Sequence, residues 1–179
     1  MTAMNRLKKA IRNIIILIIL CLLFLKSSGL YLTPLSAHEH SERSIHYGPS
    51  EVIHIEDWDG GKYILCKYDR WVSCNTVNRT LLFFWSFGNQ PTGFENDKSK
   101  AIDYTWGASR QYWKLYGIVN DDRIKKVEII LDNGQVLTQT DFYDDLFLFT
   151  WKSPENDSVY YVSIRGYDAD NNVIFEENR

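Results

Sequence analysis

The stretch YGIVNDDRIKKVEIILDNG, from Tyr116 to Gly134, decides the fold class. Between Lys125 and Leu131, apolar residues alternate with charged ones, which is the period-two pattern of a strand with one buried face. Asp132-Asn133-Gly134 follows at once, and Asn-Gly is a strong hairpin turn because it tolerates positive φ. This stretch therefore predicts an antiparallel β-hairpin.

Short strand-like segments continue toward the C-terminus. Leu146–Trp151, Val159–Asp168 and Val173–Phe175 are separated by the turn sequences SPENDS and ADNN. A spacing of about 8 to 12 residues between strands is typical of β-sandwiches. We predict that the core of this region includes Val127, Ile129, Leu148, Tyr160, Val162, Ile164 and Phe175, with Tyr160, Val162 and Ile164 on one face of their strand.

The two most regular parts of this region, YGIVNDDRIKKVEIILDNG and the late hairpin VSIRGYDADNNVIF, resemble bacterial immunoglobulin-like domains. In that family a strand ending in Gly-x-Val-x-Asp leads to Ile-x-x-Val-x-Ile, and the last hairpin contains Asp-x-x-Gly-Asn. The resemblance covers about Leu115 to Glu177 and departs from the family at Asn171, where glycine is usual. It implies an immunoglobulin-like β-sandwich over residues 101–179 that serves spacing, adhesion or partner contact, and it implies no catalytic residues.

The first half of the body has its own β pattern. Short alternating runs separated by Asp57–Gly61 and Asp69-Arg70 predict an antiparallel β meander over residues 51–100. Thr80–Phe87 is apolar on both faces, which is expected of a central strand covered on both sides, the interpretation we favour, or of an exposed aromatic surface. The polar segment Asn89–Lys100 is the predicted boundary between the meander and the sandwich.

The N-terminal segment has the pattern of a signal anchor or signal peptide, predicted over residues 1–35. Ile14–Leu25 is an unbroken apolar run that follows the cations Arg6, Lys8, Lys9 and Arg12. Extended to about residues 11–32, it predicts a transmembrane helix in an otherwise all-β chain. The expected location is the cell membrane, single-pass, with the N-terminus inside, a linker at residues 36–50 and an extracytoplasmic body. The alternative is that the segment is a signal peptide that is cleaved. The chain as a whole is similar to small membrane-anchored exported proteins of Gram-positive type with no assigned activity.

Charge narrows the classes of partner. The chain has 20 Lys and Arg and 23 Asp and Glu, and no acidic residue precedes His38. The body is therefore acidic, and an acidic surface repels phosphate backbones. The sequence predicts membrane contact through the N-terminal helix and a protein or cell-wall partner, and it argues against nucleic acid.

Candidate reactive residues are few. Cys66 and Cys74 lie on the two arms of a predicted hairpin centred on Arg70, where they would either form a disulfide or remain two buried thiols. A nucleophilic cysteine with His54 as its base is a weaker hypothesis. No residue is assigned to catalysis, to a metal or to a cofactor.

Two acidic clusters that could carry chemistry have simpler structural explanations. Asp168–Asn172 begins like a calcium loop, but it lacks the glycine and the final glutamate, so a hairpin turn is favoured. Asp141, Asp144 and Asp145 are explained as a solvated loop. The histidines His38, His40 and His46 could bind a metal weakly, but they are explained more simply as linker residues. The tryptophans Trp71, Trp85, Trp106 and Trp113 could form a sugar-stacking or partner surface, but they are explained more simply as part of the core.

The sequence therefore predicts a non-enzymatic binding module of protein or cell-envelope partners. The alternatives are a hydrolase of envelope polymers that uses the acids near Asp141–Asp145, and an accessory or immunity subunit of a membrane complex.

Overall fold

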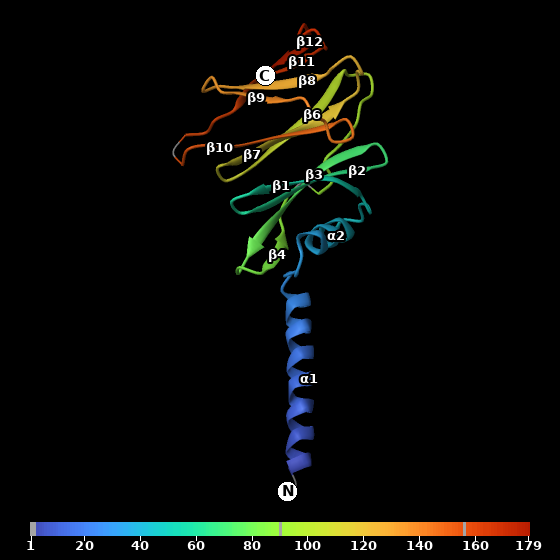
Figure 1. The fold of residues 1–179 in the computed structure, drawn as a ribbon, viewed down its shortest axis with the longest axis vertical. Helices are drawn as coiled ribbons and strands as arrows, with labels where there is room; N and C mark the ends of the chain where they lie inside the picture. Colours follow the sequence, from blue (N-terminus) through green and yellow to red (C-terminus); the bar gives the residue numbers. More distant parts are fainter. Residues whose placement is uncertain (1–2, 90, 156) are drawn as a thin grey trace.

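The computed structural model describes residues 3–89, 91–155 and 157–179 (Figure 1). A long N-terminal helix, α1, extends away from a body in which one short helix and three antiparallel sheets lie in successive layers. From α1 outward, the layers are helix α2, sheet A, sheet B and sheet C. The prediction of a β-rich chain with antiparallel sheets is confirmed.

Sheet A contains the strands of the first half of the body. Its order is β1-β2-β3-β4, and β5 pairs with β3 beyond the end of β4. The bounds are Glu51–Trp58 for β1, Gly61–Tyr68 for β2, Trp71–Thr80 for β3, Phe84–Phe87 for β4 and Phe94–Glu95 for β5.

Sheets B and C contain the strands of the second half. Sheet B has the order β10-β7-β6, and sheet C has the order β12-β11-β8-β9. The bounds are Ile102–Ser109 for β6, Tyr112–Val119 for β7, Lys126–Leu131 for β8, Val136–Gln139 for β9, Leu146–Lys152 for β10, Tyr161–Tyr167 for β11 and Val173–Asn178 for β12. The hairpin between β8 and β9 turns at Gly134, which has a φ of 85°, so the predicted turn is confirmed.

Sheet B is the middle layer, and its strands β7 and β10 bury side chains on both faces. Along β10, Phe147 and Phe149 enter the core shared with sheet C, whereas Leu146 and Leu148 pack in the core shared with sheet A. In β7, Leu115 and Tyr116 divide between the two cores in the same way. A strand covered on both sides has a nearly continuous apolar sequence, which explains the runs in these two strands.

A buried lysine ties sheet B to sheet A. Lys114 on β7 is 2% exposed, and its Nζ donates to the carbonyl oxygen of Cys74 and, over 2.9 Å, to Oγ1 of Thr76. The ammonium also lies 5.2 Å from the ring centroid of Tyr63 and 5.8 Å from that of Tyr116. Burial lowers the pKa of Lys114, and these contacts supply the polar partners that a buried amine requires.

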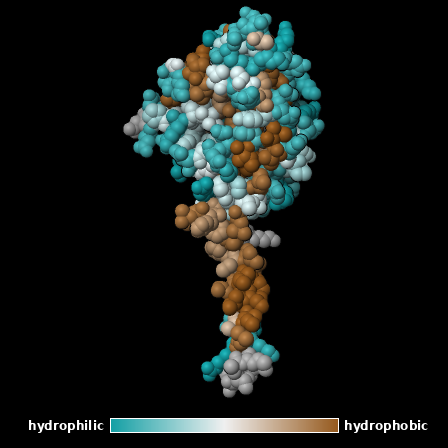
Figure 2. Space-filling view, in the orientation of Figure 1, coloured by the Kyte–Doolittle hydropathy of each residue, from teal (hydrophilic) through white to brown (hydrophobic). Residues whose placement is uncertain are grey.

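Helix α1 spans Ala3–Ser27, and its apolar side chains are exposed to solvent (Figure 2). Among the described residues, neither helix combines the length and the apolar character needed to cross a membrane. This finding contradicts the predicted all-β fold with a transmembrane helix at about residues 11–32, and with it the predicted single-pass location in the cell membrane. The reason is length, since the apolar run Ile14–Leu25 spans only about 18 Å as a helix against a hydrocarbon core of roughly 30 Å, and Arg12 and Lys26 bound it.

A second helix occupies part of the segment that was expected to be a linker without regular structure. Helix α2 spans Pro34–Ser44 and begins at Thr33, whose side chain accepts a hydrogen bond of 3.1 Å from the backbone nitrogen of Ser36. Pro34 stands at the first helical position, where its missing N–H costs nothing. The Thr-Pro pair is thus a helix start signal that the periodicity of the sequence did not reveal.

The predicted face of β11 is wrong in part. Ile164 is fully buried, as are Val127 and Ile129 on β8, but Tyr160 and Val162 are 38% and 39% exposed. The pairing of β11 with β8 shifts register between Tyr161 and Ser163. Such an irregularity reverses the side chains on one side of it, so Tyr161 takes the place in the core that was expected for its neighbours.

Truncation on β11 should separate these two environments. We expect Ile164→Ala to lower the free energy of unfolding by about 2 to 5 kcal/mol, because it leaves a cavity in the core between sheets B and C. Val162→Ala should cost less than about 1 kcal/mol. Urea unfolding of both variants measures this difference, and equal losses would refute the assignment of faces.

Candidate functional site

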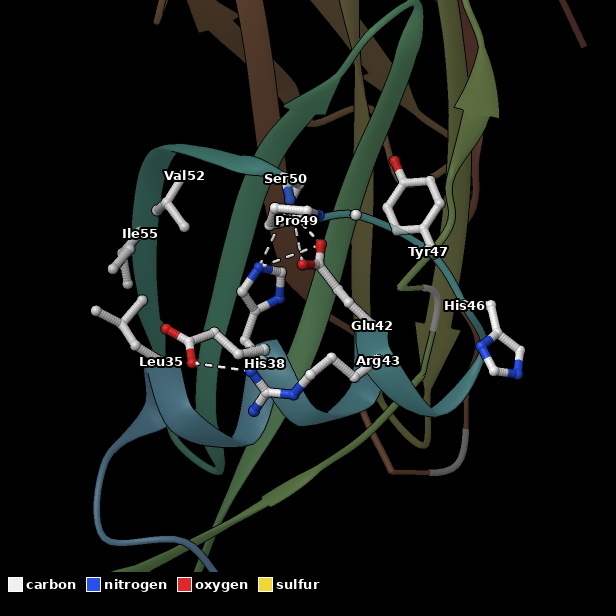
Figure 3. Close-up of a pocket in the computed structure, with 12 residues that line it drawn as sticks. Leu35, His38, Glu42, Arg43, His46, Tyr47, Pro49, Ser50, Val52 and Ile55 are labelled. Carbon is white, nitrogen blue, oxygen red and sulfur yellow. Dashed lines mark hydrogen bonds and ion pairs between the residues drawn. The ribbon is translucent and has the colours of Figure 1, made fainter.

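A hollow lies where helix α2 meets strand β1 (Figure 3). Its volume is about 720 Å³. Its walls come from α2, from the segment that connects α2 to β1, and from β1 itself. The lining residues are Leu35, His38, Glu39, Glu42, Arg43, His46, Tyr47, Gly48, Pro49, Ser50, Val52 and Ile55.

Helix α2 is held against the outer face of sheet A by a small apolar core. Ala37 of the helix packs with Ile64, Cys66 and Val77 of β2 and β3, all of them buried. Ile55 of β1 packs at the edge of this cluster. The contacts thus fix the helix over β3 and β4, with Ile64 and Cys66 of β2 at its side, and leave the space next to β1 open.

Beneath the hollow lies a buried polar cluster built on two residues one helical turn apart. Glu42 is 3% exposed, and its Oε1 lies 3.4 Å from Nε2 of His38. Its Oε2 accepts a hydrogen bond of 3.2 Å from the backbone nitrogen of Ser50, and its Oε1 accepts one from the Ser50 hydroxyl. Gly48, with a φ of 85°, allows this approach, because a Cβ there would lie 2.7 Å from Oε2 of Glu42.

The other side of the His38 ring is held by sheet A. Nδ2 of Asn75 on β3 lies 3.0 Å from Nδ1 of His38 and 2.6 Å from the hydroxyl oxygen of Ser41. An amide nitrogen can only donate, so Nδ1 accepts and the proton of the neutral imidazole is on Nε2. That proton points toward Glu42 and Ser50, whose oxygen is 3.3 Å from Nε2. Burial lowers the pKa of His38, while Glu42 and Glu39 act in the opposite direction.

A thiol completes the cluster. Sγ of Cys66 lies 3.5 Å from Nε2 of His38, so Cys66, His38 and Asn75 have the order of a nucleophile, a base and an orienting amide. The electrostatics oppose that role, because burial raises the pKa of the Cys66 thiol to about 12 and the side chain has no exposed surface. Nε2 also carries a proton, so it cannot accept one from the thiol. The cluster therefore positions α2 and the connecting segment rather than supplying a thiolate.

Sequence reasoning missed Glu42, Ser50 and Asn75. The available signal was the spacing of His38 and Glu42, which lie on one helix face only once the helix start at Thr33 is recognised. His54, considered as the base, lies elsewhere. Its ring is stacked on Tyr143 at 3.6 Å, and its Nε2 is 3.0 Å from Glu56.

Cys66 and Cys74 are both free and buried, which is the second of the two alternatives that the sequence left open. The turn at residues 69 and 70 pairs Cys66 with Ser73 and Cys74 with Leu65. An offset of one residue places the two thiols on opposite faces of the sheet, which explains why Cys66 belongs to the core under α2 and Cys74 to the core under sheet B.

The acidic candidates form turns. Asp144 and Asp145 adopt positive φ between β9 and β10, and Oδ2 of Asp144 lies 2.6 Å from Nζ of Lys67. Oδ1 of Asp168 accepts 2.9 Å hydrogen bonds from the backbone nitrogens of Asp170 and Asn172, which is the pattern of an Asx turn.

The histidine and tryptophan candidates do not gather at one place. His38 is buried, His40 lies beside Tyr31, and His46 is exposed at the rim of the hollow. Trp113 stacks on Trp106 and Trp151 near sheet C, Trp85 packs under α2, and Trp71 lies at the start of β3. Within the described ranges, no three His, Cys, Asp or Glu side chains come together as a metal site.

The His38 environment predicts a pH dependence of stability. A histidine whose pKa is lowered in the folded state favours the neutral form, so stability is full above the ordinary pKa of 6.5 and decreases as the pH falls through the lowered value. We expect His38→Gln to reduce the loss of stability between about pH 7 and pH 5. Urea unfolding at both pH values tests this, with His46→Asn as the control. A His38→Gln variant as sensitive to pH as the unchanged chain would contradict the burial argument.

Comparison of the chain with protein-family models, with curated proteins and with solved structures finds no match to any of them.

Proposed function

We propose that this protein is a non-enzymatic binding module that takes up an extended peptide segment of a protein partner along strand β1. The observation that carries the proposal is the position of the hollow beside α2, directly against the free edge of sheet A. A peptide that adds a strand to such an edge gains backbone hydrogen bonds from the strand and specificity from an adjoining pocket.

The edge is available over the whole length of the strand. β1 is the first strand in the order of sheet A and pairs with β2 on one side, and among the described residues no strand pairs with its other side. An edge strand leaves a row of backbone N–H and C=O groups without strand partners. These groups are what an added strand would bond.

The side chains of β1 supply the second half of the binding surface. Val52 and Ile55 both line the hollow, while His54 between them stacks on Tyr143 on the other face. A register irregularity between Val52 and His54 accounts for the unequal spacing. With Leu35 of α2, these residues form an apolar wall next to the free edge (Figure 3).

The chemistry of the buried cluster supports binding over catalysis. His38, Glu42 and Ser50 make their hydrogen bonds to one another and to Asn75, and the nearby Cys66 is held as a neutral thiol. The hydrolase alternative rested on the acids near Asp141–Asp145, of which Asp144 pairs with a lysine in an exposed turn. Backbone bonding by an edge strand also favours a protein partner over a cell-wall polymer.

We further propose that residues 101–179 are the immunoglobulin-like unit that carries sheet A, as the resemblance implies. Seven strands divide into sheets of three and four around one core. In chain order, the sheets are 5-2-1 and 7-6-3-4, which is the order of the constant-type immunoglobulin fold except that the fourth strand joins the other sheet. Asn171, where glycine is usual in the family, has a φ of 63° and so adopts the conformation that glycine would favour.

A bulky residue in the hollow should abolish peptide binding without unfolding the chain. Val52 is 37% exposed, so Val52→Trp can fill the hollow at little cost to the core. We expect this variant to bind peptides selected from a random displayed library at least about tenfold more weakly than the unchanged protein. Val136→Trp is the matched control, because Val136 is also exposed, at 50%, and lies on β9, an edge strand of sheet C.

Hydrogen exchange locates the bound peptide. The selected peptides should slow exchange of the β1 amides, since those groups gain hydrogen-bond acceptors on strand addition. Selected peptides that leave β1 unprotected and bind both tryptophan variants equally would overturn the proposed function.

A further inference from the structure

We infer that the peptide taken up by β1 combines one aliphatic side chain, held in the hollow, with two consecutive cationic residues beside it. This inference rests on the proposed function and adds the chemical class of the partner. It follows from the charges that β1 presents next to the hollow.

Strand β1 is acidic from end to end. Its sequence EVIHIEDW contains Glu51, Glu56 and Asp57 and no lysine or arginine. The side chain of Asp57 is 74% exposed and that of Glu56 is 43% exposed. Both carboxylates are therefore accessible to a strand that lies alongside.

The neighbouring contacts leave these carboxylates available to a further partner. Asp57 pairs through Oδ1 with Nζ of Lys62, at 2.5 Å, and Glu56 pairs through Oε2 with Nε2 of His54, at 3.0 Å. In each pair the contact is made by one of the two carboxylate oxygens, and the second oxygen takes no part in it. A carboxylate can accept several hydrogen bonds, so each of these groups can take a second donor.

The register of the strand sets the spacing of the expected motif. Ile55 and Asp57 pair with Ile64 and Lys62 of β2, so they lie on the face of the hollow, while Glu56 points to the other face. An added residue opposite Ile55 would direct its side chain to the hollow. The next two added residues would lie opposite Glu56 and Asp57, where cross-strand pairs of opposite charge are favourable.

The same charges argue against a second copy of this chain as the occupant. Two β1 strands side by side would bring six carboxylates into one narrow ribbon, since each strand carries three, and like charges across a strand pair are destabilising. A cationic peptide carries charges of the opposite sign to those of β1. Charge complementarity thus selects a basic segment of another protein.

Three peptides of one design test the inference. Each is a capped peptide of alternating threonine and valine with a central isoleucine. In the three peptides, this isoleucine is flanked on both sides by a pair of lysines, of threonines or of glutamates. The pairs stand on both sides so that the design serves either strand direction. We expect the lysine peptide to bind about tenfold more tightly than the glutamate peptide, as measured by fluorescence polarisation. The preference should decrease as salt is added.

Removal of the charges of Glu56 and Asp57 should abolish the preference for the lysine peptide but should not abolish peptide binding. The double variant Glu56→Gln, Asp57→Asn should bind the lysine and threonine peptides with similar affinity. The matched control is Glu155→Gln, Asp170→Asn, which neutralises two exposed acids in turns beside β10 and β11. This control should keep the full preference.

The outcomes separate the inference from the proposed function. Two outcomes would overturn the cationic motif alone. One is equal binding of all three peptides. The other is no binding of the lysine peptide while library-selected peptides still protect β1. Failure of every peptide to protect β1 would overturn both. Retention of the lysine preference in the double variant would show that another acidic surface selects the peptide, and the inference would fall.

Discussion

The arrangement of the body depends on one constraint, which is that two neighbouring strands of sheet B bury side chains on both faces. Its strands β7 and β10 place apolar side chains on both sides, so each face requires its own cover. Sheet C covers one face and sheet A covers the other. Lys114, buried between sheets A and B, donates to two acceptors on β3, and this fixes how sheet A sits on sheet B. A buried amine without those acceptors would cost several kcal/mol, which makes other placements of sheet A unfavourable.

Sheet A then has an outer face that must also be covered, and α2 covers only part of it. The helix packs over β3 and β4, and the network from His38 to Asn75 fixes its rotation. Buried polar networks of this kind specify one arrangement more than they add stability. Because α2 has only eleven residues, β1 lies beyond its cover. The hollow is thus a consequence of this partial cover, and it adjoins the free edge because β1 is the terminal strand of sheet A.

The sequence predicted the elements whose pattern is local. The alternation of β8 and the Asn133-Gly134 turn require only neighbouring residues, and both occur as predicted. The errors arose where a single residue changes the outcome. A register irregularity moved Val162 out of the core, and a two-residue turn paired Cys66 with Ser73 instead of Cys74. The candidate site could not be predicted, because it joins α2, the segment after it and β3, and no local pattern links Ser50 or Asn75 to Glu42.

The acidic character of β1 has a physical role even before any partner binds. Edge strands tend to pair with other chains, and proteins limit this by keeping edges short, covered, irregular or charged. The other edge of sheet A is the four-residue strand β4, which Tyr31 partly covers through a bridge to Trp85. β1 has eight residues and relies on an irregularity and on its carboxylates instead. Charge protects an edge only against partners of the same sign, so the carboxylates that oppose pairing of β1 with itself are the groups through which we propose that it selects a basic strand.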